Sequence, residues 1–195
     1  ALADETDRPL LMLCADEQEC RRQAADLRAL TGQEPVLLPA REWQLRPTAA
    51  YSRQWEYRRL WVLYRLSQRD RRVVVATAAA MIQLCLPEQG LRDTAFTLEV
   101  GQRYDVTALT ARLTAAGYVR AQQVEGAGQF ALRGGILDVF SPGPERPVRC
   151  EFFDDELDSM GDFDVTTQRR VENRQRFTVL PAGEVLPFYG EGTAD

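Results

Sequence analysis

Arg149 and Phe153 are the residues whose types and spacing best fit a binding site. They lie in the segment VRCEFF, residues 148–153, in which apolar and polar residues alternate. Side chains alternate across a β-strand with period two, so one set should face a core while Arg149, Glu151 and Phe153 lie on the exposed face. A guanidinium that can bind carboxylates, beside an aromatic ring, has the composition of a protein-binding hot spot.

Arg133 is a third candidate, because the Gly134-Gly135 pair follows it. A tight turn at two glycines would return the chain and bring Arg133 over the same sheet face. An alternative stays open. Phe153 could tuck under the loop from residue 140 to residue 147 while Arg149 pairs with the neighbouring glutamate, which would leave an ordinary sheet surface.

Arg58, Arg65 and Arg69 form a second candidate site, on or next to a helix expected over residues 52–68. The spacing i, i+3, i+4, i+7 gives this helix an apolar face, made of Tyr57, Leu60, Trp61 and Tyr64. The three arginines project on a neighbouring stripe that could contact a phosphate backbone. The competing interpretation is a solvated face with salt bridges to Glu56 or Asp70.

Several kinds of chemistry are excluded by composition. All 24 basic residues are Arg, since the chain contains neither Lys nor His. A phosphate-binding loop needs its Lys, and a Ser-His-Asp triad or a His-liganded zinc needs its His. We therefore expect no enzymatic activity, no bound cofactor and no small-molecule substrate for this chain.

Neither the acidic run nor the cysteines predict a metal site. Residues 154–158, DDELD, lack the alternating spacing of a calcium loop and are expected to form a turn and a solvated strand edge. The four cysteines show no CxxC pairing. Cys14 and Cys150 lie in apolar patterns and are expected to be small buried side chains with reduced thiols.

The charge is distributed unevenly along the 195 residues. Residues 1–92 carry 14 Arg against 12 Asp and Glu, a balance of +2, whereas residues 93–195 carry 10 against 17, a balance of −7. A domain that binds phosphates usually shows the opposite sign, so the second half is better suited to a protein partner than to nucleic acid. No apolar run is long enough to span a membrane and no export signal is visible, so we expect a cytoplasmic protein without a membrane partner.

The first half should alternate strands and helices. Apolar runs predict strands at residues 10–14, 36–38 and 73–76, the first of them buried as in a parallel sheet. Asp16 should cap the helix that Gly32 ends, and Thr77 should cap a helix through Leu84. The βαβ order predicts an α/β domain with a parallel sheet over residues 1–93.

The second half should form a small α+β domain with an antiparallel sheet over residues 94–180. Asp105 should cap a helix with Leu109, Leu113 and Ala116 on its buried face, and short strands should follow between glycine-rich turns. Leu86 to Asp93 reads as the boundary between the domains, because Pro87 and Gly90 interrupt the pattern. Residues 181–195 are expected to be a linker toward a neighbouring domain.

The segment from Phe130 to Arg169 resembles the UvrB-like region of the bacterial transcription-repair coupling factors. The matching pieces are RGG at 133–135, ILDVF at 136–140, the Pro-Gly loop, VRCEFFDDELDS at 148–159 and FDVTTQR at 163–169. The resemblance implies that this module docks UvrA in nucleotide excision repair, with Arg133, Arg149 and Phe153 at the contact positions. It implies that the first domain is a degenerate RecA-like version of the first UvrB domain.

The resemblance also implies a longer protein, in which RNA polymerase and DNA are further partners and a downstream motor uses ATP and Mg²⁺. Two alternatives stay open. One is a fragment of UvrB itself, a DNA-loading ATPase subunit, which should show a phosphate loop upstream of Ala1. The other is a nucleic-acid-binding domain that uses the arginine stripe of the 52–68 helix.

Overall fold

The structure, a computed structural model, describes residues 10–41, 53–68 and 73–184. The chain divides into two compact units, Ala1–Glu88 and Gln89–Asp195, called here the first and second units. Each unit has its own sheet and its own core.

The sheet of the first unit is parallel, with the strand order β1-β3-β2. Its strands are β1 (Leu10–Cys14), β2 (Val36–Leu38) and β3 (Val73–Thr77). The central strand β3 is buried on both faces, as its run of valines predicts. The expectation of a buried first strand is wrong in part: β1 is an edge strand in the described sheet, and Leu11 and Leu13 are 47% and 58% exposed.

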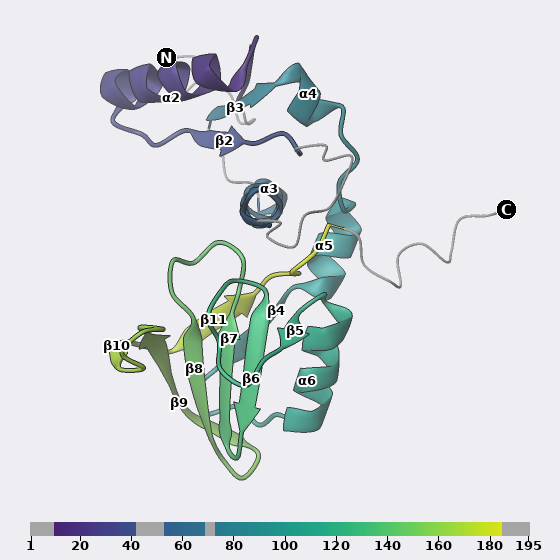
Figure 1. Cartoon of the computed structure of the whole chain (residues 1–195), viewed down its shortest axis with the longest axis vertical. Coiled ribbons are helices and arrows are strands. Elements are labelled where there is room, and N and C mark those ends of the chain that lie inside the picture. The colour runs from purple at the N-terminus through teal and green to yellow at the C-terminus, as the bar shows by residue number, and fades with distance from the viewer. Residues whose placement is uncertain (1–9, 42–52, 69–72, 185–195) are drawn as a thin grey trace, which may run out of the picture. The chain divides into compact units, whose positions relative to one another are not determined.

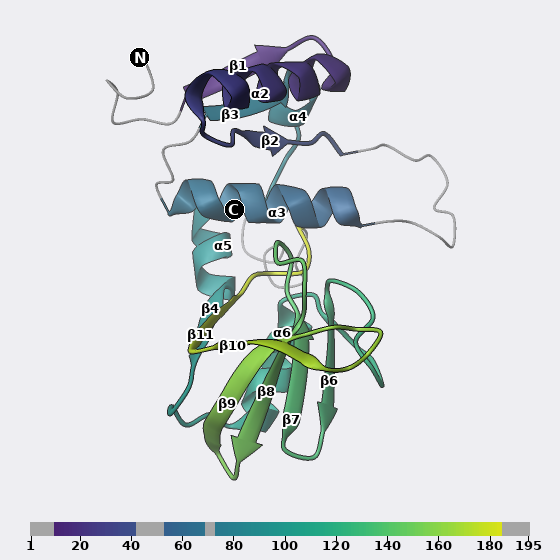
Figure 2. The ribbon, with the colours of Figure 1, turned by 90° about the vertical axis from the view of Figure 1, so that its left-hand side faces the viewer.

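Helices cover both faces of this sheet (Figures 1 and 2). α2 (Glu17–Thr31) packs Cys20 and Ala24 against Val75, and α3 (Gln54–Ser67) packs Val62 against Val74 and Ala76. The predicted caps of α2 are confirmed. Asp16 accepts a hydrogen bond from the Glu19 amide, and Gly32 ends the helix with φ = 68°. The unit is thus an α/β layer, and its more specific RecA-like assignment stays a prediction.

The second unit contains a six-stranded sheet with the order β10-β9-β8-β7-β6-β5 and a two-stranded ribbon, β11-β4. The large sheet consists of β5 (Val119–Arg120), β6 (Gln129–Arg133), β7 (Ile136–Phe140), β8 (Val148–Phe153), β9 (Glu156–Phe163) and β10 (Arg170–Arg174). All its pairs are antiparallel except β5 with β6, so the sheet is mixed rather than wholly antiparallel. The ribbon joins β4 (Phe96–Glu99) and β11 (Arg176–Val179).

Helix α6 (Val106–Ala115) lies along one face of the six-stranded sheet (Figures 1 and 2). The expected face is confirmed, because Leu109, Leu113 and Ala116 are buried, and Asp105 caps the helix through the amides of Thr107 and Ala108. The core on this side is apolar and includes Leu98, Phe130, Leu137, Val139, Val148, Cys150, Leu157 and Met160. The opposite face of the sheet is only partly covered, and it carries the candidate site.

The two units divide between Glu88 and Gln89, inside the stretch predicted as the domain boundary. Gly90 does not interrupt the pattern there, because it is buried within a helix, α5 (Glu88–Thr94). Two further expectations about segments between elements are corrected. The helix capped by Thr77 is the short α4 (Ala78–Met81) and does not reach Leu84. The first residues of the predicted linker, 181–184, are buried, with the Ala182 amide bonded to the Ala116 carbonyl at 2.7 Å. Residues 185–195 lie outside the described part.

Candidate docking surface

The alternation predicted for VRCEFF is present in β8. Val148 and Cys150 are fully buried, whereas Phe153 is 80% exposed at the end of the strand. The burial of Cys150 raises the pKa of its thiol to about 12, so this group is an inert part of the core. Arg149, Glu151 and Phe153 share the other face, the one that α6 does not cover.

Asp138 organises this face. It lies on β7 directly opposite Arg149 in the antiparallel register, and it is completely buried. Arg149 donates from Nε to Asp138 Oδ1 at 2.7 Å and from Nη2 to Oδ2 at 2.9 Å. Arg133 donates from Nη2 to the same Oδ2 at 2.7 Å. Two arginines therefore share one buried carboxylate. They supply the positive charge that the buried Asp138 carboxylate requires.

Arg149 is less exposed than its place on the outer face predicts. Its side chain is only 16% exposed, because it lies over the Phe163 ring at 4.3 Å and bonds to Gln168 as well as Asp138. The hydrogen bonds to Asp138 raise the pKa of the guanidinium, against the opposing effect of burial. Phe163 itself belongs to a small apolar cluster with Val124 and Ala131.

Arg133 reaches Asp138 because of the turn between β6 and β7. Gly134 has φ = 58°, a conformation that glycine adopts without strain. Gly135 packs against the β8 backbone: its carbonyl accepts from the Phe152 amide at 2.8 Å, and a Cβ added to it would lie 2.8 Å from the Phe152 oxygen. The two glycines thus return the chain over the sheet face, as the sequence predicts.

The alternative interpretation of this strand is wrong in both parts. Phe153 is exposed rather than tucked under a loop, and Arg149 pairs with Asp138 rather than with Glu151. Glu151 instead pairs with Arg170 at 3.0 Å. Sequence reasoning missed the role of Asp138, although a carboxylate inside the apolar strand ILDVF was a usable signal.

The arginines predicted to form a stripe on α3 differ in their surroundings. Arg58 is exposed, Arg65 lies over the Trp61 ring at 4.8 Å, and Arg69 lies outside the described residues. Arg59, the residue after Arg58, is fully buried and donates to the carbonyls of Pro39 and Ala80. Nothing in the helical periodicity distinguished the buried Arg59 from its exposed neighbour.

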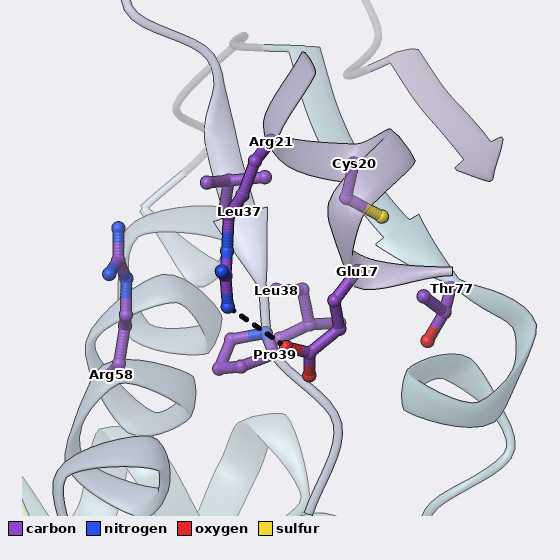
Figure 3. A pocket seen from close by; sticks show the side chains of 8 residues that line it. All are labelled: Glu17, Cys20, Arg21, Leu37, Leu38, Pro39, Arg58 and Thr77. Carbon is purple, nitrogen blue, oxygen red and sulfur yellow. Dashed lines mark hydrogen bonds and ion pairs between the residues drawn. The ribbon is translucent and has the colours of Figure 1, made fainter. Parts of the chain in front are cut away.

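A small pocket lies beside Arg58 at the carboxyl ends of β2 and β3 (Figure 3). Its lining includes Arg21 and Glu17, which form an ion pair at 3.2 Å, and the pocket encloses about 90 Å³. Ligand pockets for small molecules usually measure about 300–1,000 Å³.

The adjacent N-terminus of α2 is occupied by carboxylates of the chain itself. Asp16 accepts from the Glu19 amide at 2.8 Å, and the Glu19 carboxylate accepts from the Ala15 amide at 2.9 Å. In nucleotide-binding α/β folds a phosphate takes this position. The pocket is therefore smaller than a typical ligand site, and the Ala15 and Glu19 amides beside it are already bonded within the chain.

Other functional groups are sparse in the described ranges. Among residues 10–41, 53–68 and 73–184, no cluster of three or more His, Cys, Asp or Glu could hold a metal. Asp154 and Asp155 form the turn between β8 and β9. The four cysteines are free, and Cys14, Cys20 and Cys150 are buried while Cys85 is exposed. Within the same ranges, no helix is long and apolar enough to cross a bilayer.

Comparison with known proteins gives consistent matches. Residues 96–184 match the family described as "UvrB interaction domain". The chain is 32% identical over 187 residues to the transcription-repair-coupling factor of Bacillus subtilis and 32% identical over 185 residues to that of Escherichia coli. It is 36% identical over 172 residues to that of Mycobacterium tuberculosis. These alignments cover 95%, 94% and 84% of the chain, but only 16%, 16% and 14% of the relatives.

Proposed function

The chain belongs to the transcription-repair-coupling factor family, and from this premise we propose that its second unit is a protein-docking module that binds UvrA. The docking surface is the face of the six-stranded sheet that carries Arg133, Arg149 and Phe153. All three residues lie within the segment that matches the interaction-domain family. Their types match the contact positions that the resemblance implies.

The exposure of Phe153 is the observation that carries this proposal. A phenyl side chain that is 80% exposed contributes little to the core of this unit. It lies on the same sheet face as two arginines, and an aromatic ring beside arginines is the composition typical of interface hot spots. A partner that covers Phe153 would gain apolar contact area, and its carboxylates would meet a positively charged site on an otherwise acidic module.

Arg133 is the arginine better placed for direct contact. Its side chain is 46% exposed, and its bond to Asp138 uses one of its N–H groups. The remaining donors can bind a carboxylate of UvrA. Truncating one partner of a charge pair that is buried in a complex commonly costs about 2–5 kcal/mol of binding free energy.

Hydroxyl-radical footprinting of the free and UvrA-bound chain tests the proposal. Phe153 should be oxidised rapidly in the free chain and be protected when UvrA from the same organism is added. Leu30, which is 84% exposed on α2 in the first unit, serves as the matched control and should be oxidised equally in both samples. Equal oxidation of Phe153 with and without saturating UvrA would refute the docking surface.

The whole protein is expected to do more than this chain, which spans about a sixth of the length of its relatives. We propose that the full-length protein also binds RNA polymerase and DNA, and that a downstream ATP- and Mg²⁺-dependent motor translocates it in the cytoplasm. In that scheme this chain acts in docking and not in ATP hydrolysis, because it has no Lys for a phosphate-binding loop. The relatives reported above are coupling factors, which favours this assignment over a UvrB fragment.

A further inference from the structure

Gln168 bonds to Arg149 of the docking surface and has an unusual backbone conformation. It is one of two non-glycine residues with positive φ in the described part of the chain, at φ = 59°. Residues other than glycine adopt this left-handed conformation rarely, and such positions concentrate at functional sites. Here the conformation turns both oxygens of Gln168 toward one side chain, Arg149.

Arg149 is almost fully engaged within its own chain. Its Nη2 donates to the Gln168 side-chain oxygen at 2.8 Å, and its Nη1 donates to the Gln168 main-chain oxygen at 3.3 Å. With the two bonds to Asp138, four of the five N–H groups of the guanidinium are used. Within the described residues, one Nη1 hydrogen of Arg149 is left for a partner.

The loop that carries Gln168 is itself tightly closed. The Asp164 carboxylate accepts from the Thr167 amide at 2.7 Å and from the Thr166 amide at 3.1 Å. The Gln168 amide donates to the Asp164 carbonyl at 2.8 Å, and its side-chain Nε2 donates to the Val165 carbonyl at 2.8 Å. The side-chain amide of Gln168 therefore joins this loop to Arg149 on β8.

We propose that Gln168 and Asp138 are positioning residues that lock Arg149 in its docking conformation. This inference rests on the proposed UvrA function and changes the part that Arg149 plays in it. Arg149 is held in one conformation with one N–H left unused, and Arg133 and Phe153 make the wider contacts. Holding a long side chain in place before binding removes the entropy cost of ordering it in the complex, so the lock strengthens binding without touching UvrA.

The test uses Gln168→Gly, which removes the side-chain amide and accommodates the left-handed backbone without strain. Its thermal stability should stay close to that of the unaltered chain, while its affinity for UvrA, measured by titration calorimetry, should fall about tenfold or more. In ¹⁵N-arginine spectra the Arg149 Nη resonances should be resolved by hindered rotation in the unaltered chain and should merge in the variant.

A matched control comes from the other side of the same sheet. Arg174 forms a similar bidentate pair with the buried Asp162, at 2.6 and 2.7 Å. Asp162 alternates with Gly161 along β9, so this pair lies on the face opposite to Arg149. Arg174→Ala should lower stability and leave the affinity for UvrA unchanged.

The outcomes separate this inference from the proposed function. If the unaltered chain binds UvrA and Gln168→Gly binds equally well, the lock is overturned and the docking surface stands. If the unaltered chain does not bind UvrA, both are overturned. Should Gln168→Gly disturb folding, Gln168→Asn replaces it, because Asn tolerates positive φ and its amide is one methylene too short to keep the bond to Arg149. The same tenfold loss is expected, and retained affinity overturns the lock.

Discussion

At the scale of single residues, the surface depends on a carboxylate that no partner can reach. Asp138 is completely buried and satisfies two arginines that differ in exposure, Arg149 at 16% and Arg133 at 46%. The types and the shared face of Arg149 and Phe153 were predictable from the period-two alternation of β8. The pairing was not predictable, because the partner of Arg149 comes from another strand whose register the sequence alone does not set.

Arg149→Ala should therefore destabilise the second unit, contrary to what an exposed arginine would predict. Removing it leaves the buried Asp138 with Arg133 as its remaining partner, and breaking such a pair costs about 3 kcal/mol. Urea unfolding measures this loss. Arg133→Ala is the matched comparison and should cost less than about 1 kcal/mol, since Arg133 is half exposed and Asp138 keeps Arg149. Equal losses for the two variants would contradict the arrangement.

At the scale of elements, the sequence predicted turns and helix caps best. It predicted least well which strands are buried by neighbouring elements. Glycine pairs and capping residues act locally, so the β6–β7 turn, both ends of α2 and the N-terminus of α6 followed from the sequence. Leu11 and Leu13 are exposed because β1 lies at the edge of the described sheet. Helix α5 continues through Gly90 because that glycine is buried within it. Both are tertiary effects that local patterns do not report.

Gly135→Ala should distort the β6–β7 hairpin. Its new Cβ would lie 2.8 Å from the Phe152 carbonyl oxygen, a backbone atom that cannot move aside alone. Overpacking of this kind costs about 1–3 kcal/mol. Gly126→Ala is the matched control, because nothing lies within 4 Å of its added Cβ and its φ is not positive, and it should be neutral or slightly stabilising. Thermal unfolding of the two variants makes the comparison.

The loop from Asp164 to Arg169 should respond to acid. Hydrogen bonds from Thr167 and Thr166 lower the pKa of Asp164 below its ordinary value of 3.8. A lowered carboxyl pKa means that the stabilisation is complete above the ordinary value and is lost as the pH falls through the lowered folded-state value. The Thr167 amide resonance should therefore titrate with a midpoint below pH 3.8. Asp164→Asn should abolish that titration, and a midpoint at or above 3.8 would show that the loop bonds are absent.

At the scale of the whole molecule, the charge balance and the order of the strands indicate the class of protein but not its partner. The acidic balance of the second half and the absence of Lys and His predicted a protein-binding module rather than an enzyme or a nucleic-acid-binding domain. The two-unit division and the parallel and mostly antiparallel sheets follow from strand spacing. The identity of the partner does not follow from composition, and it rests on the family and on one exposed surface.

The affinity of the chain for UvrA, with and without Phe153, tests the central claim most directly. Phe153→Ala should weaken binding at least about tenfold, which corresponds to about 1.4 kcal/mol of lost interaction, without changing the unfolding midpoint. Val119→Ala is the control, because Val119 is 60% exposed on β5, at the far edge of the same sheet, and its loss should leave affinity unchanged. If Phe153→Ala and Val119→Ala bind UvrA as tightly as the unaltered chain, this face is not the docking surface.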